Sequence, residues 1–278
     1  MMRASAKKGL LAALAVLLLG TAALFLVGTT EEMVTVTYKV ESPEVDTPIR
    51  LVLVTDLHSC DYGENQEDLL DAIAAQHPDG ILLGGDIIDD DIPREKGELF
   101  VTEVSRTYPT YYVSGNHEYR TDDIDGIKAF IQCAGATVLE GDCIPLTVDG
   151  QTIQICGVDD PEGVGRETMD RQLAQAAAQA DPDHFTILLS HRPELIHQYR
   201  SYSTFDLILS GHAHGGQWRI PGLLNGLLAP NQGFFPKYAG GRYDFSDCTF
   251  LVSRGLARES TSIPRLFNSP ELVIIDIT

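Results

Sequence analysis

Metal-binding side chains follow five apolar segments of this sequence, each at the point where the segment ends. Asp56 closes the run IRLVLVTD, and Asp86 closes the run GILLGGD. Carboxylate, imidazole and amide ligands without cysteine suit Mn, Fe, Zn or Mg. A single histidine after a strand is usually structural, so the predicted metal site depends on all five groups occurring together. The groups are Asp56-Leu57-His58, Gly85-Asp86-Ile87-Ile88-Asp89, Gly115-Asn116-His117-Glu118, Ser190-His191 and Gly211-His212-Ala213-His214.

The segments before these groups have the pattern of buried strands. Ile49–Asp56 and Gly80–Asp86 are almost continuously apolar, which is typical of strands covered on both faces. Asn65–Gln76 lies between them and has apolar residues at helical spacing. Strands that alternate with helices predict one α/β domain. Because strand ends of an α/β sheet gather at one edge, we expect the five groups to form one patch.

The rest of the sequence continues this alternation. Asp149-Gly150 between two short strands is a strong hairpin signal, and the glycine- and proline-rich Gly215–Gly241 predicts a long ordered surface loop near the active site. Helices are expected over Lys96–Arg106, Asp123–Cys133 and Arg166–Ala180. Strands are expected over Met33–Val40, Thr110–Val113, Ile144–Val148, Thr152–Cys156, Phe185–Leu189, Leu207–Leu209, Thr249–Ser253 and Leu272–Ile277.

The order D-x-H, G-D-x-x-D, G-N-H-E, H, G-H-x-H resembles the calcineurin-like metallophosphoesterase family over about residues 49–277. The continuation GHAHGGQWRIPG and the tail SRGL…IPRLFNSPE resemble its bacterial membrane-anchored branch, whose members include phosphodiesterases of lipid-linked or UDP-sugar substrates. The resemblance implies an α/β fold in which helices flank a sandwich of two mixed β-sheets.

The resemblance also implies a centre of two divalent metal ions, with Mn expected and Fe, Zn or Mg as alternatives. Two cations about 3.5–4 Å apart lower the pKa of a water between them, and the resulting hydroxide attacks phosphorus in line. One ion is expected to be bound by Asp56, His58, Asp86 and His214. The other is expected to be bound by Asp86, Asn116, His191 and His212, so that Asp86 bridges the two ions.

His117 has a different role in this resemblance, because it is not a ligand. It would stabilise the transition state or protonate the leaving oxygen, and Asp89 would orient it. The alternative is a structural histidine that holds the Asn116 loop. Asp90 stands where protein Ser/Thr phosphatases have a substrate-binding arginine, which disfavours phosphoprotein substrates. The run Asp89-Asp90-Asp91 is otherwise typical of a solvated acidic turn.

The chain is strongly acidic, with 20 basic and 40 acidic residues and a net charge of −20. Such a surface repels polyanions, so nucleic acid is not an expected partner. None of the five cysteines falls in a C-x-x-C pair, and an odd count excludes a fully paired disulfide framework. We expect scattered reduced thiols and no disulfide.

The N-terminal segment Gly9–Gly28 carries no charge, with Lys7 and Lys8 before it and Glu31 and Glu32 after it. As a helix it would be about 30 Å long, which is the thickness of a bilayer core. Basic residues before the span keep the N-terminus in the cytoplasm. Residues 1–30 are therefore expected to form a single-pass anchor in a bacterial cell membrane, with the domain of residues 31–278 outside the cytoplasm. A cleaved signal peptide is the alternative.

Three functions are compatible with these features. The favoured one is a phosphodiesterase or phosphatase that acts on a small or lipid-linked envelope substrate. The alternatives are an exported nucleotidase or nuclease, and a non-catalytic anchored binding module, which the complete set of ligands and His117 disfavours. Apolar residues of the long loop either line an acyl groove or pack the loop onto the domain. They are Trp218, Leu223, Leu224, Leu227, Leu228, Phe234 and Phe235.

Overall fold

The computed structural model describes residues 14, 18–20, 25–29, 32–258 and 263–278. Most of the predicted anchor, Gly9–Gly28, lies outside the described residues. Within the part of the chain that is described, no helix has the length and apolar character to cross a bilayer. The anchor and the boundary at residue 30 therefore stay predictions.

The first of two six-stranded sheets is built from strands at both ends of the chain, in the order β1-β14-β2-β3-β4-β5. These strands are β1 (Val34–Val40), β14 (Glu271–Ile277), β2 (Ile49–Val54), β3 (Gly80–Gly84), β4 (Thr110–Val113) and β5 (Thr137–Val138). β14 runs antiparallel to β2, and the other neighbours are parallel. The sheet is therefore mixed.

The second sheet has the order β12-β13-β9-β8-β7-β6 and is also mixed. Its strands are β12 (Gly241–Asp244), β13 (Thr249–Val252), β9 (Leu207–Ser210), β8 (Thr186–Leu189), β7 (Gln151–Gly157) and β6 (Cys143–Val148). The four central strands are parallel, and both edge strands are antiparallel to their neighbours. A short hairpin of β10 (Leu228–Ala229) and β11 (Gly233–Phe234) stands apart from both sheets.

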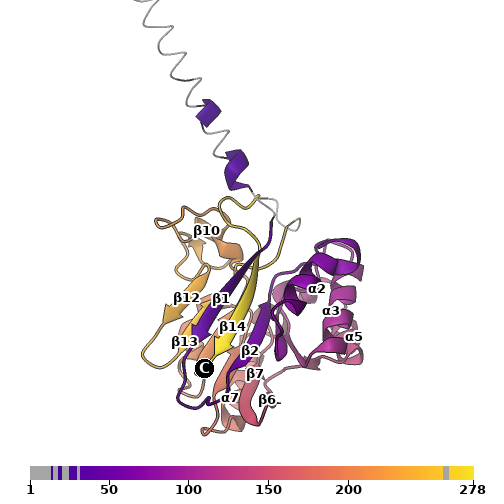
Figure 1. Cartoon of the computed structure of the whole chain (residues 1–278), viewed down its shortest axis with the longest axis vertical. Helices are drawn as coiled ribbons and strands as arrows, with labels where there is room; N and C mark the ends of the chain where they lie inside the picture. The colour runs from indigo at the N-terminus through magenta and orange to yellow at the C-terminus, as the bar shows by residue number, and fades with distance from the viewer. Residues whose placement is uncertain (1–13, 15–17, 21–24, 30–31, 259–262) are drawn as a thin grey trace, which may run out of the picture.

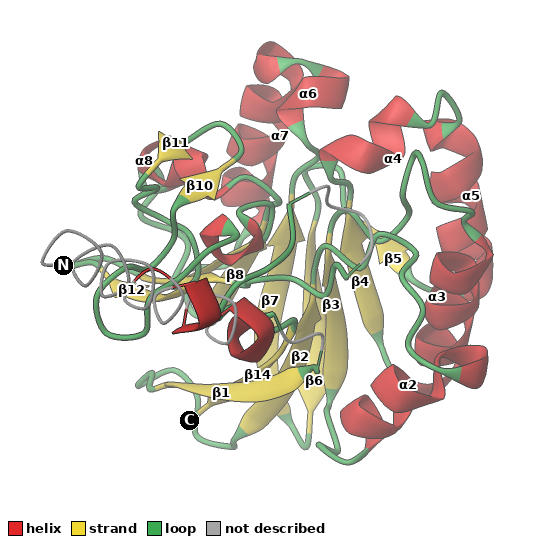
Figure 2. Ribbon diagram, turned by 90° about the horizontal axis from the view of Figure 1, so that it is seen from above, coloured by secondary structure: helices red, strands yellow, loops and turns green. Residues whose placement is uncertain are grey.

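The two sheets pack face to face over a fully apolar core that includes Leu53, Leu82, Leu189 and Val273. Helices α2 (Glu67–Ala74), α3 (Glu95–Thr107) and α5 (Ile124–Ala134) cover the outer face of the first sheet. Helices α7 (Arg166–Gln179) and α8 (Ile196–Tyr199) cover the outer face of the second (Figures 1 and 2). The predicted α/β sandwich of two mixed sheets flanked by helices is confirmed.

Short elements fill the connections at one end of the sandwich. They are α4 (Asn116–Arg120), α6 (Pro161–Val164), and the 3-10 turns η1 (Glu64–Gln66), η2 (Pro193–Leu195) and η3 (His214–Gly216). The helix predicted over Asn65–Gln76 begins two residues late, because Asn65 and Gln66 have left-handed backbones. The Gln66 side chain bonds the backbone of Tyr62 and Cys60 instead of continuing a helix.

One cysteine pair corrects the prediction of reduced thiols. Cys143 and Cys156 form a disulfide, and their Cα atoms are 4.0 Å apart. They face each other in the β6–β7 ladder because the Asp149-Gly150 turn pairs Val148 with Gln151 and each earlier residue with a later one. The register of the predicted hairpin therefore implies this pairing, whereas the number and spacing of the cysteines alone do not reveal it.

Candidate metal centre

Both sheets deliver candidate ligands to the same end of the sandwich, where the parallel strands have their carboxyl ends. Asp56 follows β2, Asp86 follows β3, and Asn116 follows β4. His191 follows β8, and His212 follows β9, with His214 two residues further on. The predicted patch is thus formed by loops of two sheets rather than by one sheet edge.

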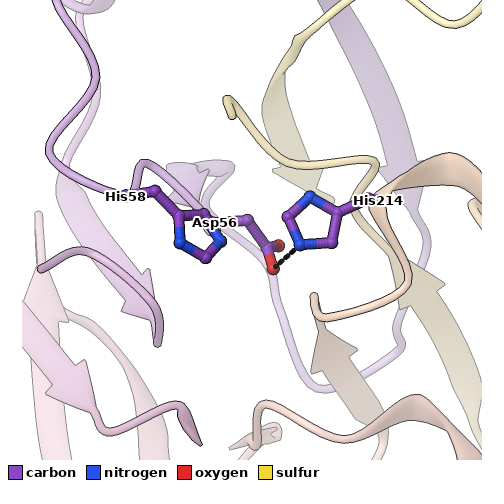
Figure 3. A group of neighbouring side chains, drawn as sticks. All are labelled: Asp56, His58 and His214. Atoms are coloured by element: carbon purple, nitrogen blue, oxygen red, sulfur yellow. Dashed lines mark ion pairs between the residues drawn. The ribbon is translucent and has the colours of Figure 1, made fainter. Parts of the chain in front are cut away.

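Three of the predicted ligands form a first group. The donor atoms of Asp56, His58 and His214 lie within 4.8 Å of one another, and all three residues are buried. His214 Nε2 is 3.6 Å from Asp56 Oδ1, and Figure 3 shows the two imidazoles with the carboxylate between them. The rings of His58 and His214 are stacked with their centroids 5.1 Å apart. This arrangement leaves one carboxylate and two ring nitrogens able to converge on one cation.

Asp86, His191 and His212 form the second group, again with donor atoms within 4.8 Å. His191 Nε2 lies 3.0 Å from Asp86 Oδ2 and 3.2 Å from His212 Nδ1. The same Asp86 oxygen lies 3.7 Å from His58 Nε2 of the first group. Asp86 therefore stands between the two groups, which is the position that a bridging carboxylate requires.

Asn116 is buried at the start of α4, and the next residue ties it to Asp86. The backbone N–H of His117 donates a 2.8 Å hydrogen bond to Asp86 Oδ1. The side-chain Oδ1 of Asn116 is buried without a hydrogen-bond partner, as are His58 Nε2 and His214 Nδ1. Buried polar atoms are normally paired, so an unpaired set of nitrogen and oxygen donors fits a bound divalent cation.

The charges of the centre also fit cation binding. Burial, together with His191 and Arg192, holds the pKa of His212 well below its usual range. Burial and the neighbouring His58 do the same for the pKa of His214. Both imidazoles are therefore neutral and have a lone pair to offer. Although burial opposes ionisation, His191 keeps the pKa of Asp86 well below its usual range, so the central carboxylate is charged.

Five of the seven predicted ligands have a positive φ, which side chains with a Cβ rarely adopt. They are Asp56 (φ 50°), His58 (50°), Asp86 (53°), His212 (65°) and His214 (45°). Each such residue costs on the order of 1–3 kcal/mol, and such conformations persist where the surrounding structure enforces them. The strain lets several side chains turn inward directly after a strand ends.

Two glycines allow the loops to approach the acidic ligands closely. A Cβ at Gly115 would lie 2.2 Å from Asp86 Oδ1, and one at Gly211 would lie 2.4 Å from Asp56 Oδ2. No side chain fits at those distances, so both positions require glycine.

His117 and its acidic neighbours differ from the expectation. Its Nδ1 is 2.5 Å from Asp90 Oδ1 but 3.4 Å from Asp89 Oδ2. Asp89 instead holds His58, whose Nδ1 is 2.6 Å from Asp89 Oδ2. The backbone N–H groups of Asp91 and Ile92 both donate to Asp89 Oδ1 and fix that carboxylate in place. The nearest partner of His117 is therefore Asp90, which is not a merely solvated turn residue.

Glu118 is a residue of the centre that the sequence reasoning quoted but gave no role. Its buried carboxylate accepts hydrogen bonds from the backbone N–H groups of Asp86, Ile87, Ile88 and Gly115, at 2.7–3.2 Å. It thereby fastens the Asp86 loop to the Asn116 loop. The spacing Gly115-x-x-Glu118 at the start of a helix is the sequence signal that could have identified it.

Arg192 and Asn231 also contact the centre and were not predicted to do so. The buried Arg192 pairs with Asp160 through Nε and, at 2.9 Å, through Nη2. Its Nη1 lies 2.9 Å from His212 Nε2, and Asn231 Oδ1 lies 2.8 Å from the same nitrogen. Asn231 belongs to the β10–β11 turn, so no local pattern connects it with His212.

Comparison with known proteins agrees with this geometry. The family model described as calcineurin-like phosphoesterase matches residues 49–216. An uncharacterized metallophosphoesterase of Helicobacter pylori is 31% identical over 63% of this chain and 46% of its own length. One of Campylobacter jejuni is 31% identical over 86% of this chain and 61% of its own. The chain thus spans about half to three fifths of the length of these relatives.

A dimetal phosphatase from Danio rerio has the same overall fold, with a TM-score of 0.50 at 13% identity. The match covers 75% of this chain and 88% of that one. The family model spans more than half of the chain, and the matched residues include all seven predicted ligands, from Asp56 to His214. The chain belongs to the calcineurin-like phosphoesterase family.

Proposed function

We propose that this protein is a metal-dependent hydrolase of phosphoester bonds, a phosphodiesterase or phosphatase with two divalent ions. The observation that carries the proposal is the position of Asp86 between two ligand groups, 3.0 Å from His191 and 3.7 Å from His58. The first ion would be held by Asp56, His58, Asp86 and His214. The second would be held by Asp86, Asn116, His191 and His212.

When bound, the ions would neutralise charge on the phosphate oxygens and acidify the attacking water. The residues of the chain supply the remaining functions. Asn116 contributes a neutral ligand, which preserves positive charge for an anionic substrate. Glu118 holds the ligand loops at a fixed separation, and Gly115 and Gly211 allow their close approach. Fixed ligands lower the barrier because they do not reorganise as charge develops in the transition state.

His117 is suited to donate a proton to the leaving oxygen. Burial lowers its pKa, but the carboxylates of Asp89, Asp86 and Asp90 outweigh burial and raise it to about 9. Its Nδ1 faces Asp90, so the proton available to a leaving group is on Nε2. That nitrogen lies 3.4 Å from Arg120 Nη1. A half-buried imidazole held in this way acts as a general acid.

The substrate class follows from charge. The net charge of −20 disfavours long nucleic acids. Asp90 is an acid that contacts His117, so this position lacks the cation that would bind the phosphate of a phosphoprotein. A small or lipid-linked phosphoester meets neither obstacle. An extracytoplasmic location is supported by the uncharged segment Gly9–Gly28 and by the disulfide, because disulfides persist in oxidising compartments. The N-terminal segment would anchor the protein to the cell membrane.

The test compares turnover of bis-p-nitrophenyl phosphate and p-nitrophenyl phosphate by the metal-loaded protein, with Mn²⁺, Fe²⁺, Zn²⁺ or Mg²⁺. Preference for the first substrate would identify a diesterase. A panel of lipid-linked, nucleotide-sugar and nucleotide phosphoesters then distinguishes the envelope hydrolase from a nucleotidase. Asn116→Ala should lose activity, whereas the matched Asn225→Ala, outside the ligand set, should keep it. Absence of turnover with all four metals would refute the proposal.

A further inference from the structure

Large apolar side chains that are exposed lie in only two places among the described residues. Six belong to the N-terminal segment, and the other six are five residues of the loop Gly215–Gly241 and Ile263, which lines a cavity together with Trp218 and Phe234 of that loop; this set is here named the apolar face. The apolar face consists of Trp218, Ile220, Leu223, Phe234, Phe235 and Ile263. Scattered exposed apolar residues need no explanation, but a concentrated patch marks an interaction surface.

The exposure of the apolar face is large. Leu223 is 82% exposed, Phe234 is 70% exposed and Phe235 is 68% exposed. Leaving such side chains in water forgoes about 1.5–3 kcal/mol each relative to burial. Beside them, Trp218, Leu228, Phe234 and Ile263 help to line a cavity of about 190 Å³ with an apolar wall. The packing of the loop onto the domain therefore leaves its most apolar residues uncovered.

The N-terminal apolar segment ends beside the apolar face. Gly28 O accepts a 2.6 Å hydrogen bond from the backbone N–H of Phe267. Its Cα packs so closely that a Cβ there would lie 2.5 Å from Leu266 Cδ1. Leu266 in turn pairs with Trp218 in a parallel bridge. Figure 1 shows the described N-terminal residues leaving the domain at the end where β10 lies.

We propose that the apolar face is a membrane-docking surface that inserts into the interfacial layer of a lipid bilayer. The uncharged segment Gly9–Gly28 indicates the occupant, because it would enter the same bilayer directly beside the face. The net charge of −20 indicates a zwitterionic rather than an anionic surface. Exposed Trp and Phe side chains are typical of segments that lie in the headgroup layer.

Docking would bring the metal centre to the membrane surface. The β10–β11 hairpin carries Phe234 on the apolar face, and its turn carries Asn231. Asn231 Oδ1 lies 2.8 Å from His212 Nε2 and 2.7 Å from Arg192 Nη1. One short hairpin therefore reaches from the proposed bilayer contact to a metal ligand. The docking does not depend on the proposed hydrolase activity, but it rests on the proposed anchoring of the N-terminal segment in a membrane.

The test uses Trp218, which is the single tryptophan of the chain. The full-length protein is reconstituted into phosphatidylcholine vesicles whose acyl chains are brominated either near the headgroup or near the chain end. An interfacial segment enters the bilayer by about 5–10 Å, so bromine near the headgroup should quench Trp218 roughly twofold and bromine at the chain end should quench little. The emission should also shift to the blue on reconstitution.

Two double variants make the result specific to the apolar face. Phe234→Ser with Phe235→Ser should reduce the quenching to near background, whereas Phe234→Leu with Phe235→Leu should keep it. The anchor is present in both, so vesicle binding itself is unchanged. Unquenched Trp218 in protein that sediments with vesicles would overturn the proposal. Equal quenching in the serine and leucine variants would overturn it too, as would a blue shift that depends on protein concentration and not on lipid.

Discussion

His117 Nδ1 lies 2.5 Å from Asp90 Oδ1 and 3.4 Å from Asp89 Oδ2, and the same Asp89 oxygen lies 2.6 Å from His58 Nδ1. Neighbouring carboxylates in one acidic turn thus serve different parts of the centre. Asp90 contacts the predicted proton donor, and Asp89 contacts a predicted metal ligand. The two side chains should therefore have separable effects on turnover and on metal binding.

Asp89→Asn should weaken metal affinity by about 10–100-fold, because residues that orient ligands contribute that much. Asp90→Asn should leave metal affinity within a few-fold and lower kcat. Metal affinity is measured by titration with Mn²⁺, and kcat at saturating metal. The converse pattern, with Asp90→Asn losing metal and Asp89→Asn losing only kcat, would contradict the assignment.

His117→Ala should lower kcat by about 10²–10⁴-fold for a substrate whose leaving alcohol needs a proton. The loss should be much smaller for p-nitrophenyl esters, because p-nitrophenolate leaves without one. The measurement is the ratio of kcat values for alkyl and p-nitrophenyl esters in the native protein and the variant. His184→Ala is the control, because His184 precedes β8 whereas the predicted ligand His191 follows it, at the other end of the strand. An equal loss for both esters would assign His117 a structural role.

Metal binding should release a proton and strengthen as pH rises. Burial lowers the pKa of His191, but the charges of Asp86 and Asp56 outweigh burial and raise it to about 10. Below that pH the imidazole carries a proton that the metal must displace. Titration calorimetry with Mn²⁺ in two buffers of different ionisation enthalpy measures the release. Identical binding enthalpies in both buffers would show that no proton leaves.

Glu118→Gln should destabilise the protein. The NH₂ group of the glutamine would replace one carboxylate oxygen, so two backbone N–H groups would lose the acceptor of their hydrogen bonds. The expected loss is about 1–3 kcal/mol of unfolding free energy, the cost of unsatisfied buried donors. Urea denaturation measures it, with Glu95→Gln on the exposed side of α3 as the control. Equal urea midpoints for the two variants would show that Glu118 does not stabilise the packing of the two loops.

Removing the disulfide with Cys143→Ser and Cys156→Ser should lower stability by about 3 kcal/mol, as expected for a closed loop of about this size. The two cysteines are 13 residues apart in sequence. Urea unfolding with and without reductant measures the effect, and Cys133→Ser at an exposed thiol is the control. A reductant that leaves the native midpoint unchanged would argue that the pair is not oxidised in solution.

The hydrophobic pattern of the sequence predicted the fold because the ligands follow apolar strands. An apolar run can be recognised from consecutive residues alone, without knowledge of tertiary contacts. The strands before Asp56, Asp86 and Asn116 were predicted within a residue or two of their observed bounds. Asp89 was expected beside His117 and lies 3.4 Å from it, but the closer approach of Asp90 could not be predicted, because it depends on two backbone hydrogen bonds that fix Asp89.

Contacts between segments that are distant in the sequence could not be predicted from the local hydrophobic pattern either. Asn231 meets His212 only because a hairpin folds back over the end of the second sheet. The Cys143–Cys156 pair is the opposite case. Its register follows from the two-residue turn Asp149-Gly150, which is visible in the sequence, so this contact is encoded locally.

The pairing of β1 with β14 has a consequence for biosynthesis. β1 (Val34–Val40) is among the first parts of the domain to be made, yet its ladder partner is Glu271–Ile277, at the opposite end of the sequence. β1 is an edge strand and β14 separates it from β2, so β1 has no ladder partner until nearly the whole chain has emerged. If the chain is translocated across a membrane from its N-terminus, β1 stays unpaired until all the other strands and helices have crossed. Pairing between such distant segments slows folding and leaves the unpaired β1 open to incorrect pairing with other chains. A chaperone that binds β1 on the side to which the domain is translocated would therefore assist folding.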